Sequence, residues 1–258
     1  VAQEVMSAAG VHMPELEISM YSDIPLTRGL GSSAAAIVGG MVAANALIGS
    51  PLTTEQIFQM AARREQHPDN VGAALFGGIV VTAWDGESAQ VLKIAPHENL
   101  EVLVVIPDYQ LETKKARKVL PEQVALKDAV YNISRSSLLV ASLCSGELGM
   151  IRHAMKDVLH QPYRAELIPG MKQILDEAVH HGALGVALSG GGPTLLALVE
   201  KGSERKQELE QFFGDTLKKE NISYQMKWLK PCLAGARVLT DFDKNSALSE
   251  TIKGDIRA

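Results

Sequence analysis

Apolar and polar positions alternate in some stretches of the chain and recur at helical spacing in others. The first residues, VAQEVMSAAG, are helix-like, and residues 15–21 (ELEISMY) alternate as in a half-buried strand. Ser32 or Ser33 can cap a long helix of small apolar residues that ends near residues 49–51. A second helix is predicted over 54–65. Strands are predicted at 79–84 and 89–94 around the turn DGES.

The remaining chain mixes strands and helices. Its predicted strands are 101–106, 184–189, 194–199, 222–229 and 235–239, and its predicted helices are 113–118, 124–145, 147–159, 170–181 and 204–220. Hairpin-like strand pairs without a steady β-α alternation favour an α+β fold. The polar, proline-containing segment APHEN suggests a boundary, so we expect domains at 1–97 and 98–241 and a polar tail at 242–258.

Composition excludes several classes of function. The 258 residues carry a formal net charge of -5, which gives no basic excess for binding nucleic acid or an anionic membrane. No apolar run is long enough to span a bilayer. The two cysteines, Cys144 and Cys232, lie far apart, which argues against a disulfide framework or a zinc site and fits a cytoplasmic protein.

The most specific local feature is the glycine-rich segment PLTRGLGSSAA at residues 25–35. Its backbone amides and the following helix N-terminus could hold a phosphate, and Ser33 could reach a magnesium ion. A tight turn with an N-cap is the simplest alternative. A dinucleotide loop of the form G-x-G-x-x-A is another, but the loop does not follow directly on a strand, and Glu55 lies within a helix.

Four further segments carry candidate chemistry. Glu65 is a possible oxygen ligand for Mg²⁺ near the polar side chains of His67, Asp69 and Asn70. Thr113 and Arg117 stand four residues apart on a helix, and Arg117 could grip a carboxylate, as could Arg164. Three glycines follow in SGGGPT. Each segment also has a purely structural interpretation: a capped turn, a solvated helix face, a surface arginine and a hairpin loop.

Together these segments resemble the GHMP kinases, a superfamily of small-molecule ATP kinases. P-x-x-x-G-L-G-S-S-A-A resembles their phosphate-binding motif, and SGGGPT resembles their third motif, with Gly191 in place of Ala or Ser. HPDNV, IPDYQLETKKARKVLP and RAELIPG resemble segments of the homoserine kinases, although Gly72-Ala73-Ala74 departs from the usual A-P-A. The first family motif, which supplies an Asn and an Asp to the acceptor site, is absent from these residues, and we expect it upstream of Val1.

The resemblance implies a two-domain fold, with a ribosomal protein S5 domain 2-like N-terminal domain and a ferredoxin-like C-terminal α/β sandwich. It implies phosphorylation of L-homoserine to O-phospho-L-homoserine, with ATP and Mg²⁺ and without a dedicated carboxylate base. A mevalonate- or shikimate-type acceptor, or a non-catalytic ligand-binding descendant, remains the alternative. The oligomeric state stays open, a homodimer included.

The resemblance also implies roles for individual residues. The nucleotide-binding set is Pro25, Leu26, Thr27, Arg28, Gly29, Leu30, Gly31, Ser32, Ser33, Ala34, Ala35, Gly190, Gly191 and Gly192. The metal ligands are Ser33 and Glu65. The substrate-binding set is His67, Asp69, Asn70, Thr113, Arg117, Arg164 and Gly191, and the catalytic set is Glu65, Thr113, Arg117 and Arg164.

Overall fold

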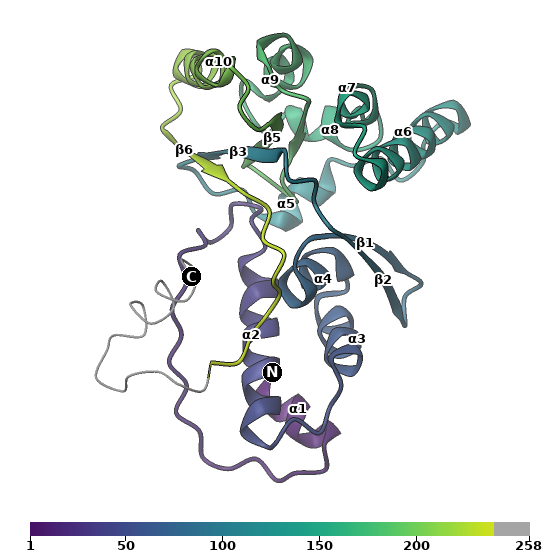
Figure 1. The fold of residues 1–258 in the computed structure, drawn as a ribbon, viewed down its shortest axis with the longest axis vertical. Helices are drawn as coiled ribbons and strands as arrows, with labels where there is room; N and C mark the ends of the chain where they lie inside the picture. Colours follow the sequence, from purple (N-terminus) through teal and green to yellow (C-terminus); the bar gives the residue numbers. More distant parts are fainter. Residues whose placement is uncertain (240–258) are drawn as a thin grey trace. The chain divides into compact units, whose positions relative to one another are not determined.

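The computed structural model describes residues 1–239, except for the side chains of Thr113 and Lys114. The predicted tail at 242–258 therefore lies outside the described residues. The chain forms two compact units. Among the described residues, unit 1 contains Val1–Pro25, Ser32–Leu92 and residues 234–239, and unit 2 contains Leu26–Gly31 and Lys93–Leu233 (Figure 1). The glycine loop thus belongs to unit 2, although the next residue, Ser32, begins a helix of unit 1.

Unit 1 is mainly helical. Its elements are α1 (Ala2–Ala8), α2 (Ser32–Leu47), α3 (Thr54–Glu65), α4 (Pro68–Phe76) and a pair of strands, β1 (Ile79–Trp84) and β2 (Ala89–Ile94). The last two residues of β2, Lys93 and Ile94, belong to unit 2. The apolar faces of α2, α3 and α4 share one core. Phe58 and Met41 are fully buried in it, and burying such side chains stabilises the fold by about 1.5–3 kcal/mol each.

The junction between α3 and α4 fixes the polar segment EQHPDN. A capping box at Thr53 and Gln56 begins α3. Gln66 ends the helix in the left-handed conformation, with φ 58°, and its amide donates to the carbonyl of Ala62. His67 then adopts an extended conformation, and Pro68 starts α4 at a position where no amide hydrogen is needed. Glu65 therefore lies at the end of one helix, and Asp69 and Asn70 lie at the start of the next.

Unit 2 is built on a four-stranded antiparallel sheet in the order β4-β5-β3-β6. The strands are β3 (Leu100–Pro107), β4 (Gly185–Leu188), β5 (Leu195–Glu200) and β6 (Tyr224–Leu229). The helices are α5 (Thr113–Lys118), α6 (Leu126–Ser145), η1 (Leu148–Met150), α7 (Ile151–Ala154), α8 (Gln161–Ala165), α9 (Met171–Glu177), η2 (Ala178–His181) and α10 (Lys206–Lys219). The strand order and the helical connections after β3 and β5 match the ferredoxin-like arrangement, as predicted.

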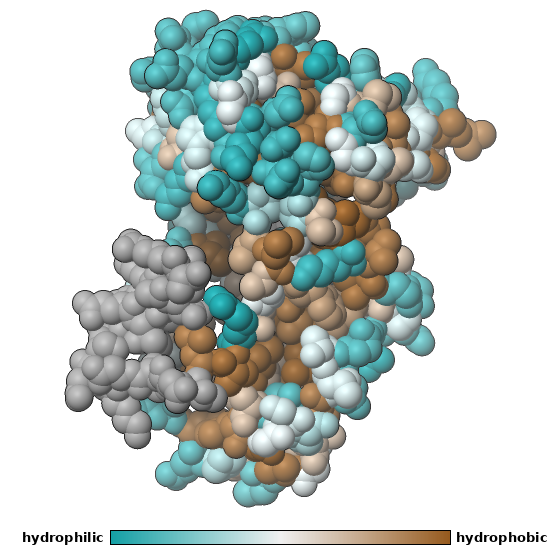
Figure 2. Space-filling model, viewed as in Figure 1, coloured by the Kyte–Doolittle hydropathy of each residue, from teal (hydrophilic) through white to brown (hydrophobic). Residues whose placement is uncertain are grey.

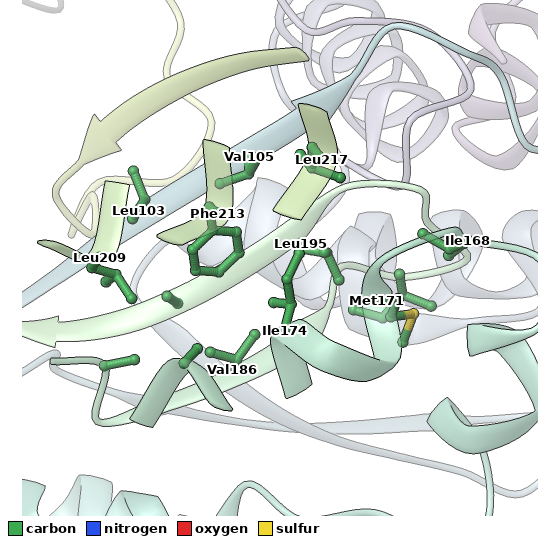
Figure 3. Packing of buried hydrophobic residues seen from close by; sticks show 14 of the residues in the cluster. Leu103, Val105, Ile168, Met171, Ile174, Val186, Leu195, Leu209, Phe213 and Leu217 are labelled. Atoms are coloured by element: carbon green, nitrogen blue, oxygen red, sulfur yellow. The ribbon is translucent and has the colours of Figure 1, made fainter. Parts of the chain in front are cut away.

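The core of unit 2 lies where the sheet meets α9 and α10. Leu209, Phe213 and Leu217 recur every four residues along α10 and are fully buried. Figure 3 shows them with Leu195 of the sheet and Ile174 of α9. The outward side of α10 is polar, and the surface over this helix is hydrophilic in Figure 2. The amphipathic pattern read from the sequence is therefore the pattern that α10 uses.

Several predicted elements differ from the structure. Residues 15–21 form no strand, and Ile18 and Met20 are 70% and 73% exposed. A strand needs a hydrogen-bonded neighbour, and no described segment pairs with this one. Residues 235–239 are not a strand either, because the chain there packs on the end of α4, where the amide of Ala236 donates to the carbonyl of Leu75.

The predicted helix 147–159 is also too long. It ends at Ala154, since Met155 leaves the helical conformation with ψ 55°. The carboxylate of Asp157 then accepts from the backbone amides of Leu159 and Gln161. An aspartate that binds nearby amides in this way favours a turn over a continued helix.

Within the described part of the chain, no helix is long and apolar enough to cross a membrane.

Candidate active site

Two glycine-rich loops of unit 2, far apart in sequence, pack directly on each other. The loop at 26–31 has positive φ at Thr27, Gly29 and Gly31. The hydroxyl of Ser189 donates to the carbonyl of Gly29 at 2.7 Å, and the amide of Thr194 donates to the carbonyl of Arg28 at 3.3 Å. The glycine loop is thereby held against the turn between β4 and β5.

Gly29 is required by this packing. A Cβ atom there would lie 2.1 Å from the carbonyl oxygen of Ser189 and 2.8 Å from the amide nitrogen of Gly192. Gly190, with φ 54°, approaches from the other side, and its Cβ position lies 3.1 Å from the carbonyl oxygen of Gly29. Both positions are left-handed, so glycine is favoured by backbone conformation as well as by space.

Arg28 is held by backbone and not by an acid. Its guanidinium donates to the carbonyl of Asp108 at 2.8 Å, just after β3. A second, longer bond of 3.4 Å reaches the carbonyl of Leu26. The Arg28 side chain therefore stabilises the loop through bonds to backbone carbonyls, and neither of these bonds neutralises its positive charge.

In unit 1, α2 begins directly after the loop at Ser32. The first amides of a helix have no partner within the helix, and the helix dipole adds a favourable potential for an anion at that end. The exposed hydroxyl of Ser33 donates to the half-buried Glu65 carboxylate at 2.6 Å. The structure thus places two oxygen groups, predicted as metal ligands, in contact at the N-terminus of a 16-residue helix.

These two oxygens suit magnesium. Mg²⁺ is commonly held by one or two protein oxygens, with waters and substrate phosphates completing its octahedron. Within the described residues, no group of three or more His, Cys, Asp or Glu side chains forms a metal cage. The Ser33–Glu65 pair therefore fits a metal that arrives with a nucleotide better than one held by the protein alone.

His67, Asp69 and Asn70 are exposed around the first turn of α4 in the same unit. His67 is the N-cap residue, yet its side chain makes no capping hydrogen bond. Asp69 lies in the first turn, where a carboxylate is favoured by the helix dipole. These three residues, predicted to bind substrate, therefore lie close together in sequence at the start of α4.

The predicted arginine pair belongs to unit 2. Arg164 is only 5% exposed, and it donates from Nε to the carbonyl of Ala116 at 3.1 Å and from Nη1 to the carbonyl of Gly190 at 2.8 Å. Burial and then the positive charge of Arg117 lower the pKa of Arg164, and Asp157 partly opposes them. Two guanidinium groups close enough to repel each other form a site that favours an anion.

Arg117 itself is exposed on α5. The backbone of Thr113 begins this helix, but the Thr113 side chain lies outside the described residues. Arg164 bonds to the carbonyl of Ala116, so the two arginines are linked through α5 as well as through their charges.

Sequence reasoning missed Ser189 and the carbonyls of Asp108 and Ala116. Ser189 precedes the three glycines and was visible in the string SGGGPT, but nothing in its spacing pointed to a partner 160 residues away. Backbone carbonyls carry no sequence signal at all, so their role as arginine acceptors is found only from coordinates.

Comparison with known proteins identifies relatives of this chain. Residues 1–78 match the family model described as GHMP kinases N terminal domain, and residues 139–218 match the model described as GHMP kinases C terminal. A protein of Deinococcus radiodurans named homoserine kinase is 44% identical over 83% of this chain and 70% of its own length. A homoserine kinase of Clostridium beijerinckii is 40% identical over 90% of this chain and 77% of its own.

A solved structure points the same way. The crystal structure of homoserine kinase from Cytophaga hutchinsonii superimposes with a TM-score of 0.76 at 32% identity, covering 83% of this chain and 69% of that one. The chain therefore belongs to the GHMP kinase family and, within it, to the homoserine kinases. The predicted α+β fold and the predicted class of enzyme, an ATP-dependent kinase, are confirmed.

Proposed function

We propose that this protein transfers the γ-phosphoryl group of ATP to the side-chain hydroxyl of L-homoserine, giving ADP and O-phospho-L-homoserine for threonine biosynthesis. The observation that carries the proposal is the buried Arg164, bonded to Gly190 of one glycine loop and lying within the field of Arg117. A pair of arginines beside a glycine-rich loop suits a substrate that carries a carboxylate in addition to the reacting hydroxyl.

In this proposal, the two glycine-rich segments at 25–35 and 190–192 bind the phosphates of ATP. The backbone amides of residues 26–35 and of Gly190 and Gly191 offer hydrogen-bond donors, and the N-terminus of α2 adds its dipole. Phosphoryl transfer needs mainly positioning and neutralisation of charge. The tight packing of Gly29 on Ser189 supports this role, because it holds donors of the loop in a fixed arrangement.

Ser33 and Glu65 would hold Mg²⁺ through their side-chain oxygens. When bound, the ion neutralises charge on the β- and γ-phosphate oxygens. In the present structure, the serine hydroxyl donates to the carboxylate. The contact between these two groups means that the pair would supply two adjacent oxygens to the cation.

Arg117 and Arg164 would hold the carboxylate of L-homoserine, and His67, Asp69, Asn70, Thr113 and Gly191 would contact the rest of it. Holding the hydroxyl in line with the γ-phosphorus supplies much of the acceleration. The threonine hydroxyl is a poor base at its ordinary pKa. We therefore assign the proton of the acceptor hydroxyl to a phosphate oxygen, late in the transfer. A cytoplasmic location and a homodimer stay predictions.

The test is an ADP-release assay on the full-length protein with a panel of acceptors: L-homoserine, L-serine, mevalonate and shikimate. We expect kcat/KM for L-homoserine to exceed every other acceptor by about 10²-fold or more, because only it satisfies both the carboxylate clamp and the reach of the hydroxyl. Equal or higher kcat/KM with mevalonate or shikimate would reject the assigned acceptor. ATP binding without turnover on any acceptor would reject catalysis itself.

A further inference from the structure

A cavity of about 540 Å³ lies in unit 2, and none of the residues assigned to ATP or L-homoserine lines it. It is bounded by the segment 155–157, by α8 with the following Glu166, and by α9. Its volume falls within the range of small-molecule sites. Apolar atoms of Met155 and Leu175 line it, beside charged groups of both signs.

Five charged side chains line the cavity: the Asp157 carboxylate is held by hydrogen bonds within the protein, and the other four are two lysines and two carboxylates. Lys156 precedes α8 and Glu166 follows it, whereas Lys172 and Asp176 belong to α9. None of these four side chains forms a hydrogen bond or ion pair with any described residue, so all four charges are available to a ligand. The cavity therefore offers two ammonium groups and two carboxylates beside the apolar atoms of Met155 and Leu175.

The opposite face of α9 explains why these side chains point away from the core. Met171 and Ile174 are fully buried and pack with Ile168 in the core of unit 2 (Figure 3). Lys172 and Asp176, which are exposed, lie four residues apart and so share another face of the helix. The cavity wall is thus built on an element that the core holds in place.

The cavity is also connected to the glycine loop through α8. Gln161 lines the cavity, and its side-chain oxygen accepts from the amide of Leu188 at 2.7 Å, one residue before Ser189. Arg164, three residues further along α8, donates to the carbonyl of Gly190. A ligand that fixes α8 therefore acts on a helix with two hydrogen bonds to the segment 188–190.

We propose that this cavity is a second ligand-binding site, which takes a small zwitterion carrying an ammonium and a carboxylate on an apolar stem, and that its occupancy is transmitted through α8 to the loop 188–192. A zwitterion satisfies charges of both signs, whereas a simple cation or anion leaves half of them without a partner. This inference does not depend on the proposed function, because binding can be measured without turnover.

Isothermal calorimetry on the full-length protein tests the site with 6-aminohexanoate as the probe. Hexanoate and hexylamine are matched controls that each lack one charge. We expect the probe to bind at least about tenfold more tightly than either control, since each lost charge pair removes a charged hydrogen bond. No binding of the probe, or equal binding of a control, would overturn the proposal.

Variants locate the binding. Lys172→Gln and Glu166→Gln each remove one charge from an exposed side chain. Each should weaken the binding of 6-aminohexanoate about tenfold or more. Lys127→Gln, an exposed lysine on α6 outside the cavity lining, is the matched control and should leave the affinity unchanged. Unaltered affinity in both cavity variants would place the probe elsewhere and reject the site.

Hydrogen exchange tests the connection to the loop. The amide of Leu188 is bonded to Gln161, so saturating 6-aminohexanoate should slow its exchange severalfold, along with that of Gly192, whose amide donates to the carbonyl of Ser189. The loop over 201–203, which follows β5, is the internal control. Binding of the probe with unchanged exchange at 188–192 would refute transmission through α8.

Discussion

Replacing Gly29 with alanine tests whether the contact between the two glycine loops holds the candidate active site together. The new Cβ would lie 2.1 Å from the carbonyl oxygen of Ser189, which is backbone and cannot rotate away as a side chain would. The φ of 76° adds a second penalty, because alanine is disfavoured in the left-handed region by about 1–2 kcal/mol.

The two effects set the expected magnitude. Overpacking a well-packed site costs about 1–3 kcal/mol. With the backbone penalty added, the free energy of unfolding of the Gly29→Ala protein should fall by about 2–5 kcal/mol. For a chain of this size, each kcal/mol lowers Tm by about 2–4 °C. If the loop separates from Ser189 to relieve the clash, Tm falls less, and the loss is seen as a higher KM for ATP.

Gly39→Ala is the matched control. Gly39 lies within α2, with no atom within 4 Å of its Cβ position and no positive φ. Alanine there should raise stability by about 0.5–1 kcal/mol, because it favours the helix. Thermal unfolding followed by circular dichroism, together with steady-state kinetics at varied ATP, measures both variants. An unchanged Tm and an unchanged KM for ATP in Gly29→Ala would refute the reasoning.

Three further predictions follow from the site. Glu65→Gln should lower Mg²⁺-dependent kcat/KM by about 10²-fold and raise the Mg²⁺ concentration needed for half activity. Glu55→Gln, on the same helix, should change neither quantity. A magnesium titration of turnover checks both variants. Arg117→Lys should raise KM for L-homoserine about 10–100-fold, with little change in KM for ATP. Arg164→Lys should also lower Tm, because it leaves the carbonyls of Ala116 and Gly190 without their hydrogen-bond donor. Steady-state kinetics with both substrates, together with thermal unfolding, separates the two roles. Burial and then the nearby Arg164 lower the pKa of His160, so below about pH 6.5 the unfolded chain binds more protons than the folded one. Tm should therefore fall as the pH drops from about 7 towards 5.5. In His160→Gln that part of the fall in Tm should disappear, and a pH profile identical to that of the unaltered protein would contradict the prediction.

Much of the architecture was readable from local patterns. The capping box at Thr53, the glycines of the loop and the four-residue period of α10 each act within a few residues of chain, so the sequence alone predicts the element. The glycine-rich and polar segments are visible in the sequence for the same reason, and the roles assigned to their residues stay predictions. Ser33 and Glu65, predicted as partners, are in contact.

Other features depended on segments that meet only after folding. Residues 15–21 alternate as a strand should, yet alternation specifies a face and not a hydrogen-bonding neighbour. The partners of Arg164 and Arg28 are backbone carbonyls, which every residue possesses and no side-chain pattern marks. The sequence by itself determined where the glycines and the functional side chains stand along the chain. Only the tertiary structure decided that Gly29 must remain glycine against Ser189, because a steric limit between residues 160 positions apart exists only once the chain has brought them together.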